Sequence, residues 1–252
     1  MLVFDIETEP ADIETIKKIT PAFDPSSFPH PGEFNSNSVK LGNLKDERKI
    51  VDKISAARQA HEDDVKNHSQ RLANAEANYW DGIVDGATLN ASIGRVCAIG
   101  YRNHAGSTNM HLATETSEQE MLVEFWRMAT TIRQQGRKMI GFYSNMFDVP
   151  FLCRRSWGSG VAVPDWIFTP TGYLTPTFVD LINIWQAGNR RDSIKLDQLA
   201  KALGIEGKPD DCTGATFWKM LRGTPEQRLA AVGYLDSDLR MTADAATRMG
   251  VM

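Results

Sequence analysis

Residues 1–8 read Met-Leu-Val-Phe-Asp-Ile-Glu-Thr, and this stretch decides the fold. Its apolar side chains predict a short strand buried in the middle of a sheet. Two carboxylates, Asp5 and Glu7, interrupt the apolar run. Side chains two residues apart on a strand point to the same face, so both carboxylates project together. Like charges beside an apolar core are costly unless a cation lies between them, and a divalent metal ion is the simplest candidate.

A plainer interpretation of these two acids remains open at this point. The strand could end at Glu7-Thr8-Glu9-Pro10, where the chain would turn to solvent. A bare Asp-x-Glu does not distinguish a metal site from a solvated strand end. The other carboxylates of the chain therefore have to decide between the two.

The composition suits one globular domain with an insertion, or two small domains. The chain has 252 residues, of which 42% are hydrophobic and 24% charged, and its formal net charge is -4. This balance gives no support to a large basic surface that wraps nucleic acid. It leaves room for a nucleic-acid enzyme, because acids that hold metals raise the acidic count while a local groove can still be basic.

The cysteines and the apolar runs predict a cytoplasmic protein that does not enter a membrane. Cys97, Cys153 and Cys212 are far apart and form no Cys-x-x-Cys pair, so we expect reduced thiols and no zinc site. Asp5 falls where the apolar core of a signal peptide would run. No apolar run approaches the roughly 18 residues that span a bilayer.

Residues 11–91 are expected to form an insertion after the first strand. Prolines and glycines up to residue 44 predict a surface loop, with a short helix at Asp12–Ile19. Residues 46–79 contain no Gly or Pro and are highly charged, which predicts one long helix that breaks at Gly82 to Gly86.

This long helix carries a heptad-like seam, of which only half the positions are apolar. Three interpretations stay open: a narrow stripe packed on the body, a coiled-coil dimer, and an arm over substrate. His61 and His68 lie seven residues apart on one face, and we expect partly exposed helix residues, not metal ligands. The seam consists of Ile54, Arg58, His61, Val65, His68, Leu72, Ala75 and Tyr79.

The remaining chain predicts an α/β domain with a mixed sheet, because hairpins and crossover helices are both present. Ser117 and Glu120 form a capping box that opens an amphipathic helix ending at Gly136. Asp148 occupies an expected helix N-cap. Strands are expected at 95–101, 108–113, 138–143 and 177–182, and further helices at 196–203, at 216–221 and from 224 onward.

Three short motifs resemble those of the DEDD superfamily of 3′–5′ exonucleases, which are DnaQ-like proteins. Phe4-Asp5-Ile6-Glu7-Thr8 resembles the first motif, and Phe147-Asp148-Val149-Pro150-Phe151-Leu152 the second, in the form found in proofreading domains of family-B DNA polymerases. Tyr234-Leu-Asp-Ser-Asp238 resembles the third motif in its tyrosine (DEDDy) variant. The stretch from Leu196 to Lys208 is similar to the connecting helix of stand-alone proofreading-like exonucleases. The resemblance covers residues 1–10 and roughly 92–250.

The resemblance implies a ribonuclease-H-like fold, with a mixed central β-sheet flanked by helices. Residues 1–252 would form a single exonuclease domain that contains the 11–91 insertion. It further implies a metal-dependent 3′–5′ exodeoxyribonuclease that prefers single-stranded 3′ ends of DNA and releases nucleoside 5′-monophosphates. Such a protein would serve proofreading, repair or recombination in a bacterial cell or a phage-infected host, as a monomer or dimer, with a polymerase or repair partner acting in trans.

The resemblance also assigns roles in a reaction that uses two Mg²⁺ or Mn²⁺ ions. Asp5 would bridge both ions, and Glu7 and Asp238 would complete the site of the ion that activates water. Asp148 would hold the second ion. Tyr234 would orient the attacking water, since a phenol with an ordinary pKa near 10 is a weak base.

Departures from the family pattern lie close to the second motif. Family members usually carry an Asn four or five residues before the second-motif Asp, where this chain has Ser144 and Tyr143, with Asn145 at minus three. This departure affects the contact that the Asn makes in the family, and not the expected metal ligand Asp148. Asp236 lies inside the third motif without the tyrosine spacing, and Asp180 is expected to be a structural acid.

Substrate recognition is predicted from side chains that stack on bases or hold phosphates. Alternatives to the DNA exonuclease are a 3′–5′ exoribonuclease, since the motifs do not distinguish the sugar, and a catalytically silent nucleic-acid-binding module. A third alternative is a dimeric scaffold built on the helix at residues 46–79. The substrate-binding candidates are Thr8, Asn145, Phe147, Phe151, Arg154, Arg155, Lys40 and Lys45.

Overall fold

The computed structural model describes residues 1–207 and 214–252. Lys208 and Cys212, which entered the sequence predictions, lie outside the described residues, whereas Cys97 and Cys153 are buried free thiols, as expected. The chain divides into two compact units. We name Met1–Ile16 with Gly86–Met252 the body, and Lys17–Asp85 the insertion unit.

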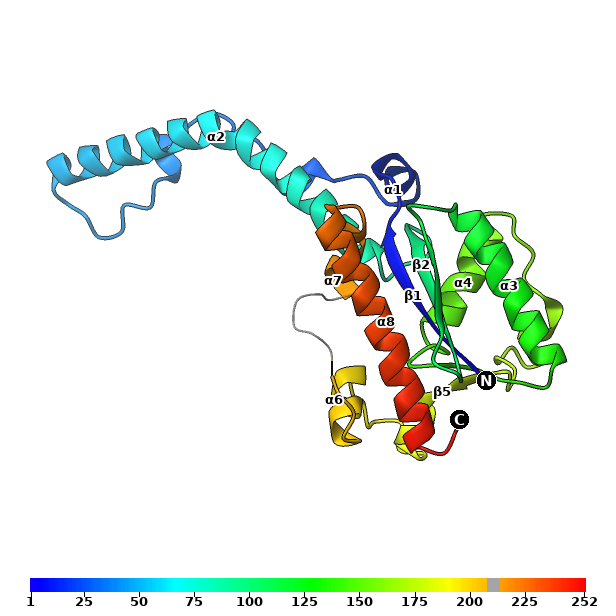
Figure 1. Ribbon diagram of the computed structural model, residues 1–252. Coiled ribbons are helices and arrows are strands. Elements are labelled where there is room, and N and C mark those ends of the chain that lie inside the picture. The colour runs from blue at the N-terminus through cyan, green and yellow to red at the C-terminus, as the bar shows by residue number, and fades with distance from the viewer. Residues whose placement is uncertain (208–213) are drawn as a thin grey trace. The chain divides into compact units, whose positions relative to one another are not determined.

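The body is built on a mixed five-stranded sheet in the order β3-β2-β1-β4-β5 (Figure 1). The strands are β1 (Leu2–Pro10), β2 (Gly94–Asn103), β3 (Thr108–Leu112), β4 (Met139–Gly141) and β5 (Phe178–Asp180). β1, β2 and β3 pair antiparallel, while β4 pairs parallel with both β1 and β5. The first strand is therefore the central strand, and the expected α/β fold with a mixed sheet is confirmed.

Helices cover both faces of this sheet. One face packs against α3 (Glu118–Gln134) and α4 (Asp148–Gly158), and the other against α6 (Leu196–Ala202), α7 (Gly214–Leu221) and α8 (Pro225–Arg248) (Figure 1). The short helix α5 (Leu181–Gln186) directly follows β5. The expected capping box opens α3, because Ser117 Oγ accepts the Glu120 N–H and Glu120 accepts the Ser117 N–H. A second box, formed by Thr224 and Gln227, opens α8.

Residues of β1 alternate between two hydrophobic cores. Phe4 and Ile6 belong to the core shared with α3 and α4, whereas Val3 belongs to the core shared with α8. Asp5 and Glu7 have the same parity as Val3, so their carboxylates share the α8 face of the sheet. The acids thus interrupt the core on which α8 lies.

The plainer interpretation, in which the chain turns to solvent at residues 7–10, is wrong. β1 continues to Pro10, which pairs with Gly94 of β2, after a register shift between Glu7 and Thr8. Glu7, Thr8 and Glu9 are all buried. The long partner strand β2 keeps this segment inside the sheet.

The insertion unit contains the end of α1 (Ile13–Ile19), most of α2 (Glu47–Ala87) and short 3-10 helices at Pro25–Ser27 and Ser36–Ser38. The expected break at Gly82 to Gly86 is wrong, because α2 continues through both glycines. A glycine in an exposed helix costs only about 1 kcal/mol relative to alanine, which the flanking helix formers offset.

The seam of α2 is covered by the segment that precedes the helix, which none of the three sequence interpretations foresaw. The His61 Nε2 lies 3.2 Å from the Gly32 carbonyl oxygen, and the His68 Nε2 lies 2.9 Å from the Phe28 carbonyl oxygen. The Tyr79 hydroxyl donates to the Pro21 carbonyl at 2.7 Å. Since carbonyl oxygens only accept, the Nε2–H group of each histidine is the donor in its contact.

No helix within residues 1–207 and 214–252 is both long enough and apolar enough to cross a membrane.

Gly100 lets α8 approach β2, the strand beside β1, and this close approach can be tested. Gly100 pairs with Asp5 across the sheet, and a Cβ at this position would lie 2.6 Å from Leu239 Cδ1 and 3.1 Å from Leu235 Cγ. We expect Gly100→Ala to lower the free energy of unfolding by about 1–3 kcal/mol through overpacking.

The control is the same substitution at Gly233 on α8, where a Cβ would meet nothing within 4 Å. Gly233→Ala should raise stability by up to about 1 kcal/mol, because alanine is the better helix former. Urea unfolding of both variants measures the difference. Equal stability of the two variants would contradict the close packing of α8 on β2.

Candidate active site

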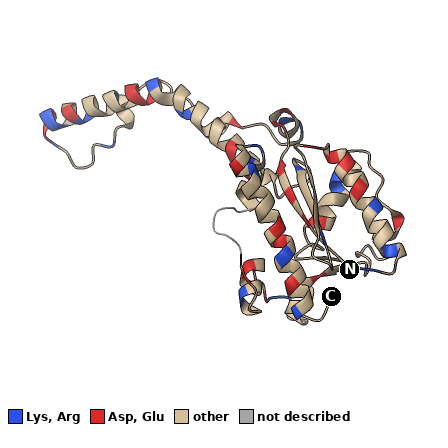
Figure 2. Ribbon diagram, viewed as in Figure 1, with Lys and Arg blue, Asp and Glu red and all other residues tan. Residues whose placement is uncertain are grey.

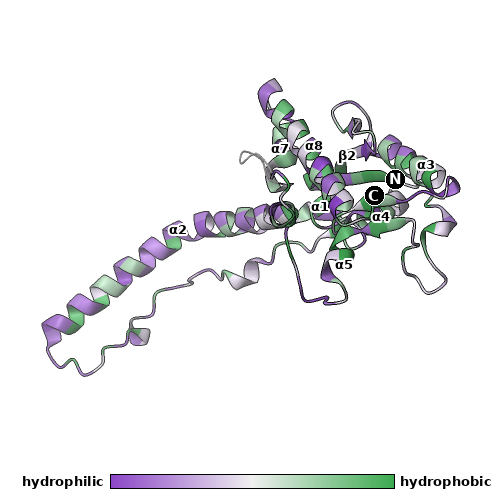
Figure 3. Ribbon diagram, turned by 60° about the horizontal axis from the view of Figure 1, so that its bottom comes forward, coloured by the Kyte–Doolittle hydropathy of each residue, from purple (hydrophilic) through white to green (hydrophobic). Residues whose placement is uncertain are grey.

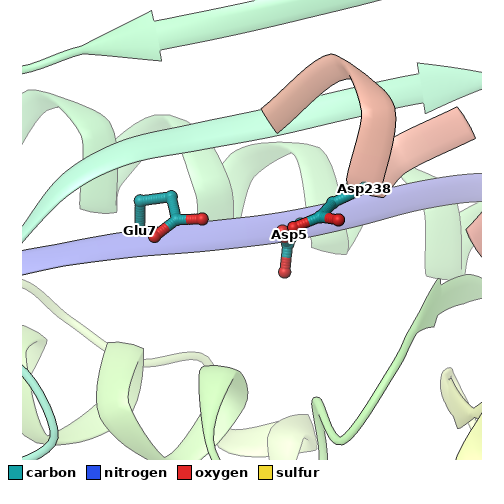
Figure 4. A group of neighbouring side chains, drawn as sticks. All are labelled: Asp5, Glu7 and Asp238. Carbon is teal, nitrogen blue, oxygen red and sulfur yellow. The ribbon is translucent and has the colours of Figure 1, made fainter. Parts of the chain in front are cut away.

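Three buried or half-buried carboxylates meet where α8 crosses the central strand. Asp5, Glu7 and Asp238 each offer an oxygen, and these oxygens all lie within 4.8 Å of one another. Figure 4 shows Asp5 and Glu7 on β1, with Asp238 reaching them from α8. Glu7 is 8% exposed and Asp238 is 6% exposed. The sequence motifs predicted this meeting of residues more than 230 positions apart.

Asp148 approaches the same strand beyond the two residues at which β4 pairs with β1. The Asp148 Oδ1 accepts a hydrogen bond of 3.2 Å from the Ile6 N–H, and the carboxyl group also hydrogen-bonds the Asp5 side chain. Asp148 is the first residue of α4 and Phe147 is the N-cap, so the predicted N-cap role is wrong. The carboxylate turns to the neighbouring strand instead of its own helix.

Burial dominates the electrostatics of Asp148. Loss of hydration raises the pKa of this carboxyl to about 7, and the negative charge of Asp180 acts in the same direction. The hydrogen bonds from the Ile6 N–H and the Asp5 side chain oppose the shift. A carboxyl group with such a pKa is easier to ionise when a cation lies beside it.

Tyr234 lies one turn before Asp238 on α8, and its ring packs on Phe217 with the centroids 6.2 Å apart. A Cβ built on Gly214 would lie 3.7 Å from the Tyr234 hydroxyl and 3.8 Å from Glu7 Oε2. The hydroxyl and the Glu7 carboxylate therefore border the same small space at the start of α7. The structure thus brings all five predicted catalytic residues to one region.

Asp180 shapes the loop that leads to Asp148. Its Oδ2 accepts from the Asn145 N–H at 2.9 Å, and its Oδ1 accepts from the Ile182 N–H at 3.3 Å. Burial raises the pKa of Asp180 against these hydrogen bonds. Tyr143 in the same loop adopts a left-handed backbone with φ 57°, which is uncommon for a residue with a side chain. These contacts agree with the structural role expected for Asp180.

An open cleft of about 490 Å³ adjoins the acids. Asp5 and Asp238 form part of its wall, and the ring of Tyr143 contributes to another part. Sequence reasoning missed most of this lining, although the position of Thr242 one helical turn after Asp238 was a usable signal. The lining comprises Asp5, Phe142, Tyr143, Ser193, Ile194, Lys195, Leu196, Gln198, Asp238 and Thr242.

Several predicted substrate-binding residues have packing roles instead. Phe151 lies in the core. Arg155 forms a two-pronged ion pair with Glu118, with N–O distances of 2.8 Å, and also donates to the Ala91 carbonyl. The Thr8 hydroxyl donates to the Thr88 carbonyl at 2.6 Å.

The other substrate-binding candidates differ in their surroundings. Phe147 is half-buried, with its ring centroid 5.4 Å from that of Phe151, and the Asn145 Oδ1 is buried without a hydrogen-bond partner among the described residues. Arg154 is exposed on α4. Lys40 and Lys45 are exposed in the insertion unit.

Glu9 is a buried acid that sequence reasoning did not single out. The guanidinium of Arg222 donates to both Glu9 carboxylate oxygens at 2.7 Å. This ion pair joins the end of β1 to the segment between α7 and α8. It needs a partner 213 residues away, which no local pattern reveals.

Comparison with protein families decides the membership of the chain. A family model described as the RNase_H superfamily matches residues 86–223, more than half of the chain. The chain belongs to the RNase_H superfamily. Nucleases of this superfamily use divalent metals, and the membership places the chain with the nuclease hydrolases. No curated protein sequence matches the chain.

A search of solved structures matched part of the chain to a polymerase. The structure of the family B DNA polymerase from the hyperthermophilic archaeon Pyrobaculum calidifontis matches with 19% identity and a TM-score of 0.48. The match covers 62% of this chain and 22% of the polymerase chain, so it involves about a fifth of that protein.

The donor set formed by Asp5, Glu7 and Asp238 fits a divalent cation. Carboxylate oxygens are hard ligands of the kind that Mg²⁺ and Mn²⁺ prefer. Three such groups within 4.8 Å, two of them buried, are a repulsive arrangement that a cation would relieve. Asp5, Glu7 and Asp238 are the residues that could hold it.

The raised pKa of Asp148 predicts a pH-dependent stability in metal-free protein. Because the folded-state pKa of about 7 exceeds the ordinary value of 3.8, the folded protein holds this proton more tightly than the unfolded chain does. The contribution of Asp148 to stability should therefore fall as pH rises from about 4 to 7. Asp148→Asn cannot ionise and can still accept from the Ile6 N–H, so it should remove a penalty of a few kcal/mol, on the order of 1.4 kcal/mol per pKa unit.

Urea unfolding in EDTA at pH 5 and pH 8 measures this effect. The stability gained by Asp148→Asn should be larger at pH 8 than at pH 5. An equal gain at both pH values would contradict the raised pKa.

Proposed function

We propose that the protein is a 3′–5′ exonuclease of the tyrosine (DEDDy) type, which hydrolyses phosphodiester bonds at the 3′ ends of DNA. The observation that carries the proposal is the convergence of Asp5, Glu7 and Asp238, with ligand oxygens within 4.8 Å, beside an open cleft. Asp148 and Tyr234 border the same region, which supports the motif resemblance residue by residue.

We further propose that the site uses two divalent ions, Mg²⁺ or Mn²⁺. Bound ions of this kind activate water, stabilise the charge of the transition state and assist the leaving oxygen. Asp5 has acids on two sides, because it shares the three-carboxylate group with Glu7 and Asp238 and also hydrogen-bonds Asp148. Asp5 is therefore the residue best placed to contribute to both ion sites.

The remaining residues act on the substrate and the water. The Tyr234 hydroxyl borders the Glu7 carboxylate, where it can hold a water by a hydrogen bond and fix its direction of approach. The cleft that adjoins Asp5 offers Lys195 for a phosphate and the ring of Tyr143 for a base. The preference for single-stranded 3′ ends remains a prediction from the motif resemblance.

Hydrolysis of end-labelled DNA tests this proposal. The protein with Mg²⁺ or Mn²⁺ should shorten single-stranded DNA from its 3′ end and release nucleoside 5′-monophosphates, and EDTA should stop the reaction. Asp5→Ala and Asp238→Asn should each lower the rate by at least about 10³-fold, because metal stabilisation of a transition state is worth several kcal/mol.

Asp236→Asn is the matched control for Asp238→Asn, two residues away on the same helix. Asp236 accepts a hydrogen bond from the Thr108 hydroxyl at 2.7 Å, away from the three acids, so this variant should keep its activity. Parallel reactions on end-labelled RNA distinguish the DNA exonuclease from the exoribonuclease alternative. Undiminished hydrolysis by Asp5→Ala would refute the proposal.

Tyr234→Phe tests the role of the hydroxyl alone. Phenylalanine keeps the packing on Phe217 and removes the group that orients the water, so we expect kcat to fall by about 10²-fold. Titration calorimetry should show Mn²⁺ binding close to that of the unchanged protein. A lost ion in this variant would assign the hydroxyl to the metal site instead.

A further inference from the structure

The charges of α2 and the turn before it are divided by sign along the sequence. Residues 40–58 contain six Lys and Arg against three Asp and Glu, whereas residues 59–85 contain two against six. Figure 2 shows the charged residues along this helix, and Figure 3 shows that most of α2 is hydrophilic. The turn before α2 and the first part of that helix thus form a basic half, residues 40–58, and the helix continues with an acidic half, residues 59–85.

The lysines of the basic half are not neutralised by the protein itself. Within the described part of the chain, Lys40, Lys45, Lys49 and Lys53 are exposed and lie in no ion pair. The nearby acid Asp46 is occupied, because its Oδ1 accepts the N–H groups of Arg48 and Lys49 at the start of α2. In the acidic half, by contrast, Arg71 pairs with Asp64 at 2.7 Å.

The order of the insertion unit does not come from buried side chains. No residue between Lys17 and Asp85 is buried. Polar bonds and ring contacts hold the covering segment on the helix instead, including Phe34 on His61 with centroids 5.6 Å apart and Arg58 4.8 Å over the Phe34 ring. An exposed helix ordered in this way carries its lysines on a fixed backbone, which lowers the backbone entropy lost when a polyanion binds.

We propose that the basic half, residues 40–58, binds the phosphate backbone of the nucleic-acid substrate. Lys49 and Lys53 lie four residues apart, so they share one face of α2, and Lys45 precedes the first turn. Unpaired lysines suit sequence-independent contact with phosphates. This inference rests on the proposed function, which makes a nucleic acid the partner of the chain.

Salt-dependent binding tests the inference without any hydrolysis. The affinity for a fluorescent single-stranded DNA of 30 nucleotides is measured by anisotropy in EDTA over a series of NaCl concentrations. The triple variant Lys45→Gln, Lys49→Gln and Lys53→Gln should bind more weakly, with a log–log salt slope smaller by about 2, since each lost phosphate contact removes about 0.7.

A matched control removes three charges elsewhere in the insertion unit. Lys18→Gln, Lys66→Gln and Arg71→Gln change the net charge of the chain equally, and this variant should keep the slope of the unchanged protein. Glutamine is a good helix former, and circular dichroism at 222 nm verifies that α2 persists in both variants.

Two outcomes would overturn the inference. The first is an equal loss of slope in both triple variants, which would reduce the effect to net charge. The second is unchanged DNA binding together with loss of a salt-sensitive dimer, which would assign the basic half to the acidic half of a second copy. Neither outcome affects the hydrolysis assays, which test the proposed function independently.

Discussion

The structure depends on a concentration of carboxylates that the rest of the fold has to keep together. Asp5, Glu7 and Asp238 hold their ligand oxygens within 4.8 Å, and Asp148 hydrogen-bonds both the strand and Asp5. Such groups repel one another and lose hydration when buried, as the raised pKa of Asp148 shows. Only rigid elements can hold them at this separation. The protein places them on its central strand, at the start of α4 and on one face of α8.

The packing that brings these elements together is specified at a few positions. Gly100, opposite Asp5, leaves the space into which Leu235 and Leu239 of α8 pack. β4 pairs with only two residues of β1, after which the loop held by Asp180 returns the chain to Ile6 through Asp148. The site is therefore a product of close approach: a helix on one face of β1, and a helix start at the edge of that strand.

Much of this arrangement could be predicted from the sequence, because its signals are local. The apolar run of β1, the capping box at Ser117 and the four-residue spacing of Tyr234 and Asp238 each show in a few neighbouring residues. The motif order then predicted which acids meet. What failed depended on distant partners: Arg155 was assigned to substrate, but Glu118 from another helix holds it.

The insertion illustrates the same limit. The sequence predicts the periodic seam of α2 but not the segment that covers it. This segment binds the seam through the backbone carbonyls of residues 21, 28 and 32, which carry no sequence signal. Likewise, Asp148 met every local requirement of an N-cap, and only the adjacent strand shows why its carboxylate turns away. Local patterns fix elements, whereas long-range hydrogen bonds fix what their polar groups do.

Diffraction from crystals soaked in MnCl₂, recorded so that manganese scatters anomalously, tests the central claim most directly. The account predicts a manganese peak bound by carboxylate oxygens of Asp5, Glu7 and Asp238, and its loss in Asp238→Asn crystals soaked identically. Manganese bound only elsewhere on the protein, with these three carboxylates unchanged, would contradict it.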